Sequence, residues 1–434
     1  MGTHPMKSRS SLTFIFLTIF IDLLGIGIVL PLLPEYVKIV ERSTWPWLAE
    51  NRALIVGALT ASYALMQFLF APVLGALSDR FGRRPVLLLS LMGTGLSYLV
   101  FALTENLTFL GVETVIGLLF LARIVAGIMG ASISTAQAYI ADVTPPNERA
   151  RGLGMIGAAF GLGFMLGPAL GGILSNVSLQ APALFAALLS FANVTFGFFR
   201  LPESLPADKR SQAQKRNLNP ISRLMAVAGD ARVQPFILGS VLFNLAFAGL
   251  QSNFPVYSDV RFNFSPQQNA FIFAFIGLIA VIVQGFLIRK LVARFGEARL
   301  TIAGLSLMAI GFAATGLATA GWMLFPAIGL VALGSGMVTP SLTSLVSQSV
   351  TATEQGSILG GVQSFNSLMM VAGPLLAGLL FDLLGPGAPY IFGAGLLTAA
   401  LTVLFSALRE RFSGRSQPEV ATISAESMVN VEQT

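Results

Sequence analysis

Residues 11–34 read SLTFIFLTIFIDLLGIGIVLPLLP, and this apolar run with a single aspartate near its middle decides the fold. A run of this length is sufficient to cross the hydrocarbon core of a bilayer as one helix. Asp22 lies about 11 residues from one end and about 12 from the other, which places it close to the bilayer midplane. A carboxylate at that depth costs roughly 2.5–3.5 kcal/mol on insertion scales, so Asp22 is a candidate functional residue that requires a partner.

Similar apolar runs recur along the 434-residue chain, which is 54% hydrophobic and only 11% charged. The pattern predicts an all-α membrane protein with twelve transmembrane helices. The predicted spans are 12–34, 53–77, 85–104, 114–138, 152–174, 182–200, 235–257, 268–288, 300–319, 322–346, 357–381 and 389–408.

The distribution of lysine and arginine predicts the orientation in the membrane. With the N-terminus inside, 21 of the 26 basic residues fall in inner segments, four fall in outer segments, and Arg123 lies within a span. Positive charge collects on the cytoplasmic side, so we expect a multi-pass protein of the cell membrane with both termini in the cytoplasm. The basic residues of the cytoplasmic segments then account for the net charge of +6, so nucleic-acid binding is not expected. The absence of cysteine excludes disulfides and thiol chemistry.

A polar, basic segment divides the spans six and six, and a repeat supports this division. The stretch FMLGPALGG at 164–172 recurs as MVAGPLLAG at 370–378, and LSDRFG at 77–82 has a counterpart in LVARFG at 291–296. We therefore expect two pseudo-symmetric six-helix bundles that rock about a site at the midplane. The expected divisions are a cytoplasmic lead at 1–11, bundles at 12–200 and 235–408, a cytoplasmic linker at 201–234, and a disordered tail at 409–434.

The loop GALSDRFGRRPVLL at 75–88 is the strongest local motif. A glycine allows two helices to approach closely, a second allows a left-handed turn, and an aspartate can face a helix N-terminus or a basic group. The alternative is a merely tight, positively charged inner loop. The later loop at 141–152 adds a second cluster of charges that either is solvated or contacts the first. The candidate residues of the two loops are Gly75, Asp79, Arg80, Gly82, Arg83, Arg84, Asp142, Glu148 and Arg149.

Arg123 is the predicted partner of Asp22. It lies on one stripe of the fourth span that should face away from lipid, together with Gly127, Gly130, Ser134 and Gln137. The depths of Asp22 and Arg123 differ by roughly 5 Å, so we expect them to pair or share water in at least one conformation. A change in their separation would alter the affinity of Asp22 for a proton. The alternative is an arginine that is permanently paired for structural reasons.

Polar and aromatic side chains within the spans are candidates for substrate binding. Such side chains also serve as contacts between helices, and the sequence leaves both roles open. A mainly apolar cavity with one acidic centre suits lipophilic, neutral or cationic compounds. The candidates are Tyr63, Gln67, Gln137, Asn244, Phe247, Gln251, Gln284, Gln363 and Asn366.

With these motifs, the chain resembles the major facilitator superfamily, in particular its twelve-span drug/proton antiporters, including tetracycline-efflux-like members. The resemblance implies that the loop at 75–84 is a gate latch, with Asp79 facing the start of span 11 and Arg83 near Asp142. It implies a role in proton transfer for Arg123 with Gly127, and a first-span motif at Asp22. It also identifies an antiporter motif in the fifth span, made up of Gly163, Gly167, Pro168, Gly171 and Gly172.

The sequence also departs from the family pattern. The second-half copy of the loop has Ala293 in place of the aspartate, so we expect a one-sided latch. The only histidine is His4, and spans 3, 8 and 9 lack acidic residues, which argues against metal–tetracycline as the substrate.

These observations favour a monomeric, proton-coupled secondary transporter that exports lipophilic small molecules by alternating access. The alternatives are a facilitator or proton symporter for a metabolite, and a receptor that does not transport. We expect no enzymatic activity, because the spans contain no cysteine, no histidine and no carboxylate pair for acid–base catalysis. No cofactor or metal is expected, and no phosphate-binding loop for ATP is present.

Overall fold

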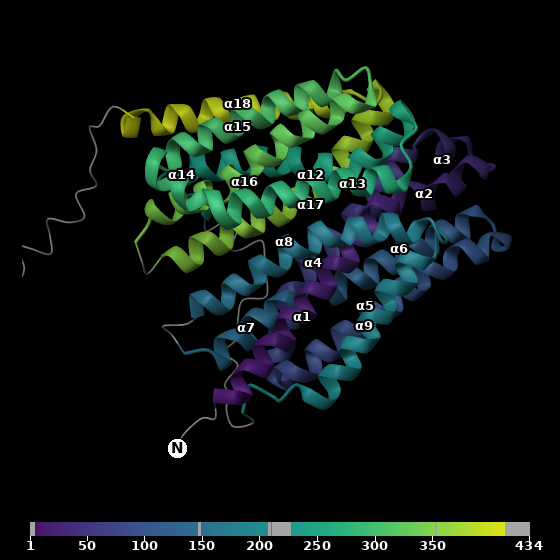
Figure 1. Ribbon diagram of the computed structural model, residues 1–434, viewed down its shortest axis with the longest axis horizontal. Coiled ribbons are helices and arrows are strands. Elements are labelled where there is room, and N and C mark those ends of the chain that lie inside the picture. Colours follow the sequence, from purple (N-terminus) through teal and green to yellow (C-terminus); the bar gives the residue numbers. More distant parts are fainter. Residues whose placement is uncertain (1–4, 146–148, 207–209, 211–226, 352–353, 413–434) are drawn as a thin grey trace, which may run out of the picture.

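The computed structural model describes residues 5–145, 149–206, 210, 227–351 and 354–412, and Figure 1 shows their arrangement in two helical bundles. The start of α1 and the end of α18 lie at the same end of the molecule, here called the terminal face. The opposite end carries the short helices α2, Leu33–Val37, and α3, Pro46–Glu50, and is called the far face. The two predicted bundles are therefore present, and they lie side by side.

The first bundle contains the N-terminal half of the chain. Its long helices are α1 (Pro5–Val29), α4 (Arg52–Phe81), α5 (Arg83–Leu103), α6 (Val112–Gly130), α7 (Ile133–Val143), α8 (Arg149–Ser175) and α9 (Ala181–Arg200). Helices α6 and α7 together form the predicted fourth span, with a turn at Ala131 and Ser132 between them.

The second bundle contains the C-terminal half. Its helices are α12 (Gln234–Phe262), α13 (Pro266–Val281), α14 (Ile288–Phe295), α15 (Glu297–Gly316), α16 (Leu324–Gln348), α17 (Gln355–Leu384) and α18 (Ala388–Phe412). A π-helical turn at Ile282–Leu287, which contains Gln284, joins α13 to α14 within one span. Such turns lie frequently at functional sites.

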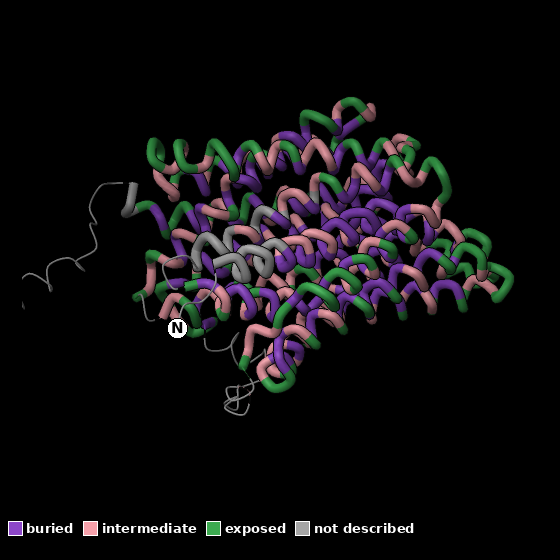
Figure 2. The backbone as a smooth tube through the Cα atoms, turned by 60° about the horizontal axis from the view of Figure 1, so that its bottom comes forward, coloured by how far each residue is buried: buried purple, intermediate pink, exposed green. Residues whose placement is uncertain are grey.

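In the described part of the chain, eleven helical segments are long and apolar enough to cross a membrane, and α8 adds a shorter apolar stretch, Gly161–Ser175. The twelve predicted spans each fall on one of these segments, so the predicted fold class is confirmed. One boundary differs, because α1 begins at Pro5 within the predicted lead. Buried residues gather along the inward sides of the helices, as Figure 2 shows. Helix faces turned outward keep many exposed apolar side chains, as lipid contact requires.

The internal repeat is visible in how the helices pack. A Cβ added to Gly167 of α8 would meet the carbonyl oxygen of Leu24 of α1 at 2.7 Å. A Cβ added to Gly373 of α17 would meet that of Leu245 of α12 at 2.8 Å. Glycine thus lets α8 press against α1 as α17 presses against α12. Asn244 lies within about one residue of the place that corresponds to Asp22.

Candidate functional site

Asp22 is buried inside the first bundle, with 5% of its surface exposed. The Ser132 hydroxyl, at the turn between α6 and α7, donates a hydrogen bond to Oδ2 of Asp22 at 3.2 Å. The other carboxylate oxygen, Oδ1, is buried and has no hydrogen-bond partner among the described residues. A buried oxygen without a partner is costly when ionised, and it is the position at which a proton or water would bind.

Arg123 of α6 is also buried, at 3% exposed, but it does not form an ion pair with Asp22 in this conformation. Its guanidinium lies over the ring of Tyr63, 4.6 Å from the centroid, and its Nε donates to the carbonyl oxygen of Leu59 at 3.4 Å. The ring face and the carbonyl compensate the charge here instead of the predicted carboxylate. The pairing in another conformation stays a prediction.

Two tyrosines connect the surroundings of Asp22 and Arg123. Tyr63 of α4 and Tyr98 of α5 both lie within electrostatic reach of each of these charges. A Cβ added to Gly25, about one turn beyond Asp22, would collide with the Tyr98 hydroxyl. The site is therefore a compact cluster on four helices, and Tyr98 is a member that the sequence analysis missed because only its position in space reveals it.

The candidates for substrate binding separate into three groups. Gln67 donates to the Gly130 carbonyl oxygen at 3.1 Å and to the Tyr63 hydroxyl at 3.4 Å, so it faces the Asp22 cluster. Asn244 donates to the Asn366 side-chain oxygen at 3.1 Å, which makes this pair a contact between α12 and α17. The remaining candidates include Phe247, whose ring stacks on Phe243, the partly exposed Gln251, and the exposed Gln137, Gln284 and Gln363.

The predicted gate loop joins α4 to α5 at the terminal face, and Gly82 adopts the left-handed φ of 103° there. Arg83 is the centre of a charge network: Nη1 donates to Asp79 at 2.5 Å, and Nε donates to Asp142 of α7 at 3.2 Å. The structure thus brings Arg83 and Asp142 together. At the start of α17, Gly356 and Ser357 are exposed. The predicted contact between Asp79 and this end of α17 stays a prediction. Glu148 lies outside the described residues, and so does the side chain of Arg149.

Glu203 is a further member of this network that the sequence analysis assigned only to the linker. Its two carboxylate oxygens accept from the backbone N–H groups of Arg83 and Arg84, at 2.8 and 3.2 Å. These N–H groups open α5, so Glu203 caps the helix and complements its dipole. The signal available in the sequence was an acidic residue directly after the sixth span.

We expect Glu203→Ala to lower the stability of the protein by about 1–2 kcal/mol, because two N–H groups at the start of α5 lose their acceptor. Thermal unfolding in detergent measures this as a lower Tm. Glu50→Ala, which removes an exposed carboxylate at the far face, is the matched control and should leave Tm unchanged. Equal Tm values for the two variants would contradict the capping role.

The second bundle carries its own charge cluster at the terminal face. Arg232 donates to Asp230 at 2.8 Å and to Glu354 at 3.1 Å. Hydrogen bonds from Arg232 and Thr351 lower the pKa of Glu354 to about 2, so this contact persists at physiological pH. The cluster is exposed, so its contribution to stability is small.

The predicted antiporter motif in α8 forms two kinds of contact. Gly163, Gly167 and Gly171 approach the backbone of α1 between Leu23 and Ile28. Gly172 instead faces α13 of the other bundle, where an added Cβ would meet Ala270 at a forbidden distance. Pro168 packs against Gly27 within the first of these contacts. The motif therefore lies both within one bundle and between the two.

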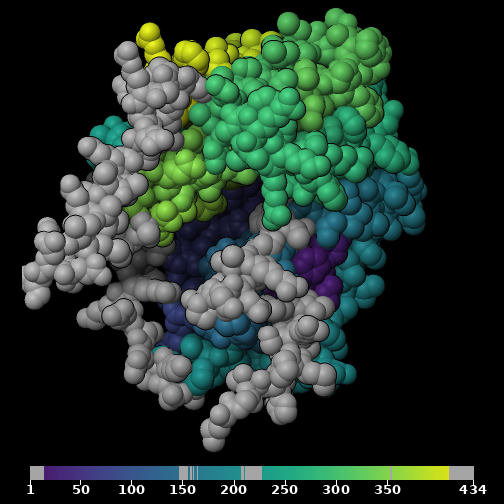
Figure 3. Space-filling model, turned by 60° about the vertical axis from the view of Figure 1, so that its left-hand side comes forward, coloured from purple at the N-terminus to yellow at the C-terminus, as the bar shows by residue number. Residues whose placement is uncertain are grey.

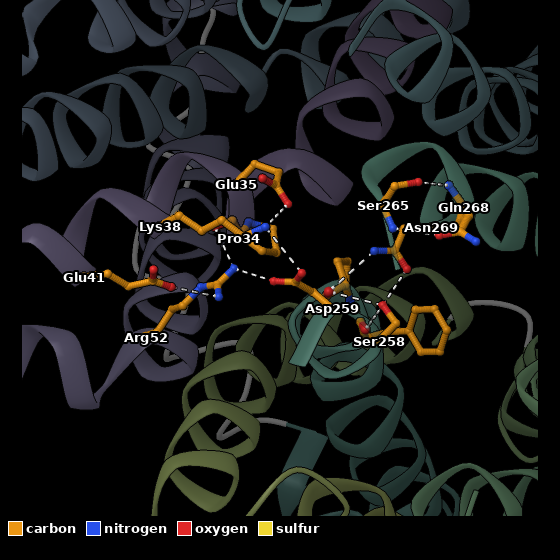
Figure 4. A network of polar contacts seen from close by, with 12 residues as sticks. Pro34, Glu35, Lys38, Glu41, Arg52, Ser258, Asp259, Ser265, Gln268 and Asn269 are labelled. Atoms are coloured by element: carbon orange, nitrogen blue, oxygen red, sulfur yellow. Dashed lines mark hydrogen bonds and ion pairs between the residues drawn. The ribbon is translucent and has the colours of Figure 1, made fainter. Parts of the chain in front are cut away.

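The far face is sealed by polar contacts between the bundles (Figure 4). Asp259 of α12 accepts from Arg52 at 2.8 Å and from Lys38 at 3.3 Å, both of the first bundle. Asp382 of α17 accepts from the backbone N–H groups of Ala53 and Leu54 at 3.3 and 2.7 Å, at the start of α4. Close approach of Gly57 to the Pro374 carbonyl continues this seal toward the interior.

The terminal face is open by comparison. Figure 3 views this face obliquely and shows a hollow between the two bundles. The structure is therefore a conformation that is open at the terminal face and closed at the far face.

Two six-helix bundles around a central hollow that is open at one side and sealed at the other define a secondary transporter. The family model of the Major Facilitator Superfamily matches residues 15–292 and 283–426. The chain belongs to this superfamily, and it is a multi-pass membrane protein that acts on a small molecule.

Individual members of the superfamily are similar to this chain over most of its length. The chain is similar to the tetracycline resistance protein, class C, of Escherichia coli, at 37% identity over 402 residues, which cover 92% of this chain and 97% of that protein. It is 29% identical to multidrug resistance protein 2 of Bacillus subtilis, with 88% of this chain and 91% of that protein covered. Among solved structures, the human organic anion transporter MFSD10 (TETRAN) matches with a TM-score of 0.68 and 29% identity, covering 93% of this chain and 100% of that one.

Proposed function

We propose that this protein exports lipophilic small molecules in exchange for protons, with Asp22 binding and releasing the proton. The observation that carries the proposal is the Asp22 carboxylate, buried near the middle of its span with one oxygen unpartnered. A carboxylate couples proton binding to a conformational change when its ionised form is unfavourable in one conformation and compensated in another, because its proton affinity then differs between the two. The similarity to tetracycline and multidrug resistance proteins supports a drug-like substrate.

In this proposal the terminal face is cytoplasmic and the protein works as a monomer. The charge distribution along the sequence supports the orientation, since most of the lysines and arginines lie at that face. The structure then corresponds to the conformation that takes up substrate from the cytoplasm. Arg123 and Tyr63 would compensate charge beside Asp22, and Gln67 would contact the substrate from the same cluster.

A pH jump in proteoliposomes tests the direction of coupling. Vesicles that are acidic inside should accumulate an antiported substrate as protons leave, whereas a proton symporter should deplete it and a facilitator should ignore the gradient. The probes are tetracycline with and without Mg²⁺ and a lipophilic cation. A receptor would bind a probe without any counterflow of labelled compound. Depletion under this gradient would reject antiport.

A further inference from the structure

The interruption of the fourth span lies directly beside the buried carboxylate. Helix α6 ends at Gly130 and α7 begins at Ile133. Between them the Ser132 N–H bonds to the Met129 carbonyl oxygen at 3.2 Å, which is the tighter i→i+3 pattern. An interrupted helix near the midplane, lining a cavity, is a position at which transporters place sites and joints.

The hydrogen bond at the start of α7 depends on whether Asp22 is protonated. Ser132 donates to Asp22 Oδ2 at 3.2 Å, and no other hydrogen bond to this carboxylate is present among the described residues. An ionised carboxylate accepts such a bond more strongly than a protonated one. Protonation of Asp22 therefore weakens the contact that holds the start of α7 against α1.

The last turn of α7 is tied to the gate. Asp142 accepts from Arg83 Nε at 3.2 Å and from the Ser204 hydroxyl at 3.0 Å, and the Tyr139 hydroxyl donates to the Pro202 carbonyl oxygen at 2.9 Å. The helix has 11 residues and is about 16 Å long, so it spans the distance between the Asp22 cluster and the terminal face. One short rigid element thus contacts both the buried carboxylate and the gate loop.

We propose that α7 transmits the protonation state of Asp22 to the gate loop, with Ser132 as the positioning residue at one end and Asp142 as the contact at the other. This inference rests on the proposed role of Asp22. It assigns to Ser132 a coupling role: the side chain touches the proton-binding group, while its effect appears at the opposite end of α7.

Other titratable groups near Asp22 do not account for a response in the neutral range. In the described residues they are Tyr63 of α4, Tyr98 of α5 and Arg123 of α6. Tyrosine and arginine ordinarily titrate near pH 10 and above pH 12. A conformational response between about pH 5 and about pH 8 that disappears with Asp22 is therefore assigned to this carboxylate.

Electron spin resonance distances between the bundles test the coupling without any substrate. Spin labels at Arg200→Cys and Ser357→Cys, two exposed positions of different bundles at the terminal face, report its opening, and the chain has no native cysteine to interfere. In the protein that carries only these two labels, the ratio of molecules open at the terminal face to molecules closed there should change at least about fivefold between about pH 5 and about pH 8. Ser132→Ala should reduce the change below about twofold.

Three further variants make the result specific. Ser132→Thr keeps the hydroxyl and should restore the response. Ser134→Ala removes a hydroxyl from the same turn of α7, one that donates to Ala71 of α4 instead, and should respond like the parent protein. Asp142→Asn, at the other end of α7, should lose the response, and combination with Ser132→Ala should add no further loss.

Asp22→Asn separates this inference from the proposed function. Loss of the response in both Asp22→Asn and Ser132→Ala supports the coupling through α7. Loss in Asp22→Asn with an unchanged response in Ser132→Ala overturns the role of α7 and leaves that of Asp22 intact. A full response in Asp22→Asn overturns both.

Discussion

Asp22→Asn should abolish uphill transport driven by a proton gradient while leaving energy-independent exchange intact. The amide has the size of the carboxylate and still accepts from Ser132, but it cannot take up a proton. One proton crossing about 100 mV supplies about 2.3 kcal/mol, which sustains an accumulation of roughly 50-fold. In the variant the accumulation ratio should fall to about 1, measured as labelled tetracycline retained by proteoliposomes at steady state.

Two measurements make this result decisive. Counterflow of the same compound without a gradient should stay within about threefold of the parent protein, which shows that the variant is folded and cycles. Glu113→Gln, which neutralises an exposed carboxylate at the far face, should retain full accumulation. Undiminished uphill transport by Asp22→Asn would reject the proposed function.

Asp259→Asn should open the far face. The carboxylate of Asp259 holds Arg52 and Lys38 of the other bundle, and its side chain is only 17% exposed. Partly screened ion pairs are worth up to about 1 kcal/mol each. These two pairs exist only while the far face is closed. Their loss should therefore raise the population of molecules with an open far face about tenfold. Spin labels at Glu50→Cys and Arg261→Cys, exposed positions on different bundles, would report it as a longer distance.

Glu41→Gln is the matched control for this seal. Glu41 pairs with the same Arg52 at 3.4 Å, but both residues belong to the first bundle, so their contact does not join the two. The distance distribution should therefore remain that of the parent protein. An equal shift in both variants would mean that Arg52, rather than a bridge between the bundles, controls the far face.

The fold was predictable because hydrophobic length alone identifies spans, and the repeat of Gly167-Pro168 in Gly373-Pro374 indicated two similar halves. The turn at Gly82 followed from residue type and spacing, and the contact of Arg83 with Asp142 followed from the family resemblance. Boundaries were less predictable, as the start of α1 at Pro5 shows, because a helix extends beyond the lipid wherever the chain allows it.

The composition of the site was only partly predictable. Asp22 was evident from its depth, but its hydrogen-bond partner is Ser132, and Arg123 lies instead over Tyr63. Depth along a helix could be read from the sequence, but depth alone does not give the neighbours of a side chain in a particular conformation. The pairing of Asp22 with Arg123 in another conformation stays a prediction. The far-face contacts of Asp259 and Asp382 were missed for a similar reason, because they join segments about 200 residues or more apart.

Asn244 lies within about one residue of the place that corresponds to Asp22, so the two halves have different roles under the proposed mechanism. Only the first half contains an acid at this depth, and the amide of the second half bonds to Asn366 of its own bundle. Natural sequence variation in the second half would then alter which compounds are recognised without changing proton binding by Asp22. Under the proposed mechanism, the range of exported compounds would then diversify through changes in one half while the proton-binding half stays the same.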